Sequence, residues 1–166
     1  MKYKILEHPS ELKIIVYGKT LEELFSNAVL AMGEIMAREL GTGKWELGMK
    51  EKIKIKSADL NSLLVDFLSE ILAKSQINKK VYRVAKIKID CHPELVSGSH
   101  RYTDSRNNEM PDQVRHDDKD ESYFLESELF GYSVTHFDED IKAVTYEDLD
   151  IKQVDGIWQT MVVFDI

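Results

Sequence analysis

The sequence predicts an α+β domain, a two-layer sandwich in which two helices pack on one side of a mostly antiparallel β-sheet. Many short segments alternate apolar and polar residues, which is typical of strands. Only two segments place apolar residues three and four positions apart, as amphipathic helices do. Asp155-Gly156 is a strong hairpin signal, and hairpins join antiparallel neighbours.

The expected strands share a period of two between apolar and polar side chains. They cover residues 3–6, 11–17, 50–56, 82–90, 123–130, 141–146, 149–153 and 157–166. In the segment 50–56, lysines alternate with Ile53 and Ile55, which predicts an antiparallel strand with one wet face. We interpret these lysines as residues that solvate the strand.

Two helices are expected, one after Thr20 and one after Asp59. Thr20 followed by Glu23 fits a capping box, in which the hydroxyl accepts from a first-turn amide and the carboxylate reaches back. Asp59 is a suitable N-cap for the second helix. The apolar stripes that follow both caps are expected to form the core rather than to hold a cofactor.

Composition limits the classes of function. With 166 residues, 43% of them hydrophobic, the chain is long enough for one domain with a substantial core. A formal net charge of -8 argues against a protein that grips nucleic acid by bulk electrostatics. The single Cys91 and the absence of a signal peptide favour a cytoplasmic location. No stretch approaches the roughly 20 apolar residues that span a bilayer, so no membrane partner is expected.

The segment from Cys91 to Glu121 differs in composition from the rest of the chain. It is rich in His, Pro, Asn and Asp and has almost no periodic apolar residues. We therefore expect a single domain over residues 1–166 with a disordered or passenger insertion at about 91–121. The histidines of this segment match no closed zinc pattern, in which ligands come in tight pairs.

No independent catalytic motif is found, since the chain lacks a Gly-rich phosphate loop, a nucleophile elbow and a metalloprotease helix. Oxygen ligation by Glu11 and Asp165 would suit Mg²⁺, Mn²⁺ or Ca²⁺. Spacing alone favours an alternative in which both are merely exposed strand-end carboxylates. The residues that remain as candidates lie near expected strand ends: Glu7, His8, Glu11, Lys142, Glu147, Asp165 and Ile166.

Five segments resemble the archease family, in the family's own order. They read YKILEH at 3–8, YGKTLEELF at 17–25, LLVDFLSE at 63–70, IKAVTY at 141–146 and VVFDI at 162–166. The resemblance covers nearly everything outside residues 91–121 and implies the archease fold.

The resemblance implies an accessory protein rather than an enzyme. Archeases assist the GTP-dependent RNA ligase of tRNA splicing and RNA repair, which joins 3′-phosphate or 2′,3′-cyclic phosphate ends to 5′-hydroxyl ends, by promoting ligase guanylylation and multiple turnover. Carried over by motif, the metal ligands are Glu11, Asp165 and the main-chain oxygen of Ile166, with His8 and Lys142 beside the metal or at the partner contact. One alternative is a chaperone-like modulator of a tRNA methyltransferase, and another is a degenerate, metal-free copy.

The chain departs from the family pattern at three places. His8-Pro9-Ser10-Glu11 stands where the family has His-Thr-Ala-Asp, so the carboxylate is kept on a longer side chain. Glu147 stands where many members have His. The insertion resembles translated bacterial palindromic repeat sequence, and we interpret it as a tolerated passenger because the entropic cost of closing a loop grows slowly with its length.

Overall fold

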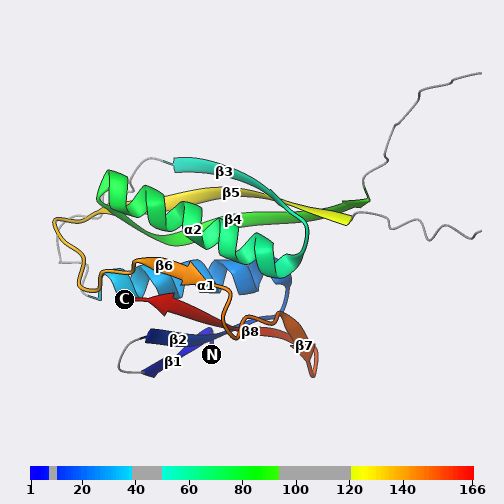
Figure 1. Cartoon of the computed structure of the whole chain (residues 1–166). Helices are drawn as coiled ribbons and strands as arrows, with labels where there is room; N and C mark the ends of the chain where they lie inside the picture. Colours follow the sequence, from blue (N-terminus) through cyan, green and yellow to red (C-terminus); the bar gives the residue numbers. More distant parts are fainter. Residues whose placement is uncertain (8–10, 39–49, 94–120) are drawn as a thin grey trace, which may run out of the picture.

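The computed structural model describes residues 1–7, 11–38, 50–93 and 121–166, which form two antiparallel sheets and two helices (Figure 1). Sheet A has the strand order β1-β2-β8-β6, with β7 also pairing β8, and sheet B has the order β3-β5-β4. The elements are β1 (Tyr3–Glu7), β2 (Glu11–Gly18), α1 (Leu21–Met36), β3 (Lys50–Ser57), α2 (Leu60–Asn78), β4 (Lys80–Pro93), β5 (Glu121–Ser133), β6 (Ala143–Thr145), β7 (Lys152–Val154) and β8 (Ile157–Asp165).

The predicted α+β class is confirmed, but the strands divide between two sheets instead of forming one. Sheet A joins the two ends of the chain, because β2 pairs with β8 from Glu11↔Asp165 to Gly18↔Trp158. The strands from the middle of the chain pair among themselves as sheet B. A period of two identifies a strand without identifying its neighbour, so the sequence pattern did not contain this division.

Helix α1 begins at the predicted cap and bridges the two sheets. The Thr20 hydroxyl accepts from the Glu23 amide at 3.1 Å, while the Glu23 carboxylate accepts from the amide of Lys19 rather than that of Thr20. Ser26 donates to the Ala85 carbonyl of β4 at 3.2 Å, and Asn27 donates to the Tyr17 carbonyl of β2 at 2.7 Å. These two bonds fix the helix against both sheets.

Helix α2 begins where Asp59 accepts from the Ser62 amide at 2.7 Å, as predicted. It packs against all three strands of sheet B and against β6 of sheet A. The rings of Phe25 and Phe67 stack with centroids 6.3 Å apart, so the two helices meet in the interior. Figure 1 shows both helices lying between the sheets, and in the described part of the chain both sheets contribute to one core cluster.

The segment that we predict to be an insertion connects β4 to β5, two strands that pair with each other. The ladder between β4 and β5 continues to Pro93↔Glu121, so Cys91–Pro93 and Glu121, which we had placed in the insertion, belong to strands. The remaining part, 94–120, lies outside the described residues. Figure 1 shows that this end of sheet B lies far from the carboxyl terminus.

None of the helices in the described ranges is long and apolar enough to cross a membrane.

Gly33 permits the close approach of α1 to β4, because a Cβ at this position would lie 2.2 Å from the Tyr82 carbonyl oxygen. We expect Gly33→Ala to lower the free energy of unfolding by about 1–3 kcal/mol through overpacking, despite the higher helix propensity of alanine. Urea denaturation measures this change. The control Ile77→Ala, at a side chain that is 80% exposed, should change stability by less than about 0.5 kcal/mol. Equal effects of the two substitutions would contradict the packing argument.

Candidate functional site

The site is organised by β8, which runs between β2 and β6. Asp165 pairs with Glu11 of β2 on one side and with Ala143 of β6 on the other. Directly paired residues of antiparallel strands have Cβ atoms about 4.5–5.5 Å apart on the same face of the sheet. The structure therefore brings the two predicted carboxylate ligands together, although they stand at opposite ends of the sequence.

Lys142 connects the same edge to the end of the chain. Its amide donates to the Asp165 carbonyl at 2.8 Å, and its Nζ donates to the carbonyl oxygen of Ile166 at 3.1 Å. Lys142, Asp165 and Ile166 are thus neighbours in space, as the predicted site requires. His8, the remaining predicted site residue, lies outside the described residues.

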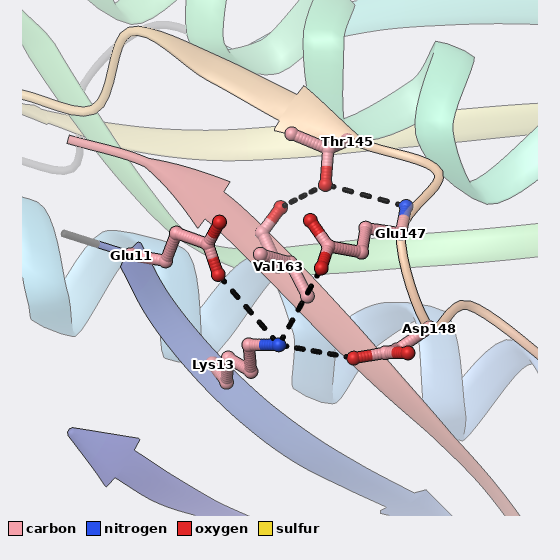
Figure 2. A network of polar contacts seen from close by, with 6 residues as sticks. All are labelled: Glu11, Lys13, Thr145, Glu147, Asp148 and Val163. Atoms are coloured by element: carbon pink, nitrogen blue, oxygen red, sulfur yellow. Dashed lines mark hydrogen bonds and ion pairs between the residues drawn. The ribbon is translucent and has the colours of Figure 1, made fainter. Parts of the chain in front are cut away.

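Lys13 lies beside this edge, on the same face of β2 as Glu11, and three carboxylates converge on its Nζ (Figure 2). Nζ lies 3.0 Å from Asp148, 3.6 Å from Glu11 and 3.7 Å from Glu147. The Lys13 side chain is only 21% exposed. The ammonium group therefore links strand β2 to the turn that follows β6.

The turn after β6 positions two of these acids, Glu147 and Asp148. The Thr145 hydroxyl donates to the Val163 carbonyl of β8 at 3.3 Å and accepts from the Glu147 amide at 3.4 Å. Asp148 adopts the left-handed conformation with φ of 55°, which aspartate tolerates better than most residues. This conformation places its carboxylate against Lys13.

The acids hold Lys13 in its charged form. The hydrogen bond to Asp148 raises the pKa of Lys13, desolvation partly opposes this change, and the charges of Asp148, Glu147 and Glu11 raise it further. Lys13 is charged at neutral pH, as other lysines are, and it neutralises part of the negative charge beside Asp165.

The donor atoms of the predicted site are of the type that a hard cation prefers, but they are few. Two paired carboxylates and a carbonyl oxygen are ligands that Ca²⁺, Mn²⁺ or Mg²⁺ accepts, with water completing the shell. Within the described ranges, no group of three or more His, Cys, Asp or Glu side chains is placed to hold a metal ion. Lysines engage two of the donors, Lys13 at Glu11 and Lys142 at Ile166. The ligand roles of Glu11, Asp165 and Ile166 remain a prediction.

Reasoning from the sequence missed Lys13 and Asp148 as members of the site. The available signal was weak: Lys13 is a charged residue in a strand of apolar neighbours, and Asp148 follows Glu147 after the IKAVTY segment. The histidines of the 91–121 segment, which match no closed zinc pattern, are mostly outside the described residues. Cys91 is an exposed strand residue, whereas His100 and His116 lie outside the described residues.

The two-sheet α+β fold defines a class with solved members. The solution structure of protein 1598 of Methanobacterium thermoautotrophicum matches with a TM-score of 0.66 and 22% identity, covering 99% of both chains. A crystal structure from Thermotoga maritima, described as an archease and possible chaperone, matches with a TM-score of 0.54 and 16% identity, covering 98% of this chain and 96% of that one.

The sequence identifies the family within this class. The model of the Archease protein family matches residues 3–166, and the chain therefore belongs to the archease family. Protein archease of Methanosarcina acetivorans is 33% identical over 165 residues, covering 99% of this chain and 96% of that protein. Protein archease of Thermoplasma volcanium is 30% identical over 169 residues, covering 100% of both. The resemblance drawn from the five segments is confirmed.

Asp148 is expected to be the main cause of the raised Lys13 pKa. Replacing Asp148 by Asn, which also tolerates the left-handed conformation, should lower the pKa of Lys13 toward its ordinary value. NMR titration of the lysine Cε resonances measures the shift. Because folding raises this pKa, the contact stabilises the folded chain below the ordinary lysine pKa, and the stabilisation is lost as the pH rises through the folded value.

The control for this titration is Asp150→Asn, since Asp150 pairs with Lys152 at 3.5 Å and is not among the acids that contact Lys13. If the Lys13 titration is unchanged in Asp148→Asn, then Glu147 and Glu11 are sufficient to raise the pKa of Lys13.

Proposed function

We propose that the chain is an accessory protein that activates the GTP-dependent RNA ligase of tRNA splicing and RNA repair, promoting ligase guanylylation and multiple turnover. The proposal is supported by membership of the archease family. The structural observation that carries it is the pairing of Glu11 with Asp165 beside Lys142 and the Ile166 carbonyl oxygen. We place this activity in the cytoplasm.

The proposed role is to present the Asp165 edge of sheet A to the ligase as a binding surface, rather than to catalyse a reaction. Glu11, Asp165 and the main-chain oxygen of Ile166 would hold a divalent cation, which would supply positive charge at this edge. Lys142 donates to Ile166 and lies at the surface, so it can contact the nucleotide-binding region of the ligase. The β-ladder on both sides of β8 keeps these groups in register, and the contact surface is therefore rigid.

Two alternatives follow from particular observations. The description of the Thermotoga maritima protein as a possible chaperone favours a modulator of another enzyme, for which we consider a tRNA methyltransferase. The engagement of Glu11 and Ile166 by lysines favours a degenerate copy that does without metal, because ammonium groups already neutralise the site.

Metal binding tests the proposed ligands. We expect wild type to bind Mn²⁺ or Ca²⁺ in calorimetric titration, and Asp165→Asn to weaken binding at least about tenfold, since a charged ligand contributes strongly to such sites. Lys13→Met should tighten binding several-fold, because it removes a positive charge beside Glu11. The control Asp150→Asn, an exposed carboxylate outside the site, should bind as wild type does.

Circular dichroism of each variant separates ligation from folding. Failure of both wild type and Lys13→Met to bind either ion would favour the degenerate copy. Unfolding of Asp165→Asn would assign that residue a structural role instead.

Ligase activation tests the function itself. We expect the folded, metal-loaded protein to increase formation of the ligase-guanylate intermediate and the number of turnovers, and Lys142→Ala to reduce this stimulation at least about tenfold by removing a surface charge at the contact. Gel-based guanylylation of the cognate ligase measures both effects. The control is Lys152→Ala, at an exposed lysine on β7.

No stimulation by folded wild type would refute the proposed activation. Recovery of a tRNA methyltransferase, without the ligase, in affinity purification would favour the alternative partner.

A further inference from the structure

A second charged surface lies on sheet B, on the side that faces away from the helices. Alternate residues of β3 point to this side, and so do the residues of β5 and β4 that pair with them. We call this surface the basic face. Its lysines outnumber its carboxylates by six to three: Lys50, Lys52, Lys54, Lys56, Lys86 and Lys88 against Asp90, Glu126 and Glu128.

The basic face has an ordered arrangement of charge. In one row Glu128 of β5 pairs with Lys52 on one side and Lys86 on the other. In the next row Glu126 stands between Lys54 and Lys88 in the same way. The two outer strands therefore carry lysines along both margins of the central strand, within a chain whose formal net charge is -8.

The carboxylates of the basic face are already neutralised. Lys54 pairs with Glu126 at 2.7 Å and lowers the pKa of that carboxyl group, and Lys50 pairs with Glu128 at 3.5 Å. Lys52 and Lys86 have no carboxylate within 4.0 Å in the described part of the chain. The positive charge of these two lysines is therefore not balanced by a carboxylate of the face.

An aromatic ring lies among the lysines. Phe130 is half-buried, and the Nζ atoms of Lys50 and Lys86 lie 5.5 and 5.8 Å from its ring centroid. Both ammonium groups lie over the ring, and they are carried by long, flexible side chains. These side chains can turn to contact phosphates while a nucleobase stacks on the ring. An acidic peptide would pair with the lysines, but its carboxylates would not need the aromatic ring.

The shape of the basic face suits an extended polymer. A cleft of about 330 Å³ lies on it, lined mainly by Lys52, Lys54, Lys86, Lys88, Glu126 and Glu128. Alternate residues along a strand are about 6.7 Å apart, so successive lysines of one margin can contact successive phosphates of an extended strand. The cleft therefore offers a charged path with regularly spaced donors.

We propose that the basic face binds single-stranded nucleic acid, with Lys52 and Lys86 contacting phosphates and Phe130 stacking on a base. The inference is independent of the proposed ligase activation. It also refines the expectation drawn from net charge, because a local excess of lysine attracts phosphate even on an acidic protein.

Fluorescence anisotropy of the full chain with labelled oligouridylate tests the proposal, and oligodeoxythymidylate distinguishes RNA from DNA. Binding should weaken with salt, with a slope of about -0.7 in log K against log salt for each phosphate contact. The double variant Lys52→Gln/Lys86→Gln should bind at least about fivefold more weakly and lose about 1.4 from that slope. The control Lys2→Gln/Lys19→Gln removes the same charge at exposed lysines outside the face.

Phe130→Leu keeps an apolar side chain and removes the stacking ring, so it should weaken oligonucleotide binding while leaving polyphosphate binding unchanged. The proposal is overturned if folded wild type does not bind at low salt, or if the control pair loses as much affinity as the lysines of the face. Polyglutamate binding as tight as oligouridylate, with Phe130→Leu without effect, would instead assign the face to an acidic protein.

Discussion

The pairing of β8 with β2 and β6 is the constraint on which the rest of the molecule depends. It closes sheet A from the two ends of the chain and leaves the middle strands to form sheet B. The same pairing sets Asp165 beside Glu11 on one face, while Leu12 and Phe164 pair in the buried core on the other. One ladder therefore stabilises the interior and aligns the polar edge, because successive side chains of a strand alternate between faces.

Charge is separated over the surface of this molecule. The edge of sheet A gathers carboxylates around Lys13, whereas the outer side of sheet B carries rows of lysine around paired glutamates. The formal net charge of -8 describes neither surface. Screening confines such fields to about 10 Å at moderate ionic strength, so the electrostatic potential at each surface follows its local composition.

Local rules predicted the helices well and the assembly of the sheets poorly. Thr20 and Asp59 were recognisable as caps because a cap acts within one helical turn. The division into two sheets was not recognisable, since strand pairing is a long-range choice. The adjacency of Glu11 and Asp165 came from family resemblance, not from spacing. Asp148 was missed because its contact with Lys13 depends on a left-handed backbone conformation that no local sequence pattern indicated.

The hairpin formed by β4 and β5 has a practical consequence. Pairing at Pro93↔Glu121 holds the two ends of the segment 94–120 next to each other. They lie at the end of sheet B that is far from the carboxyl terminus (Figure 1). The entropic cost of closing a segment between fixed ends grows only with the logarithm of its length. We therefore expect this hairpin to be a suitable grafting point, where a fluorescent or affinity module in place of residues 94–120 would report on the protein without touching the Asp165 edge.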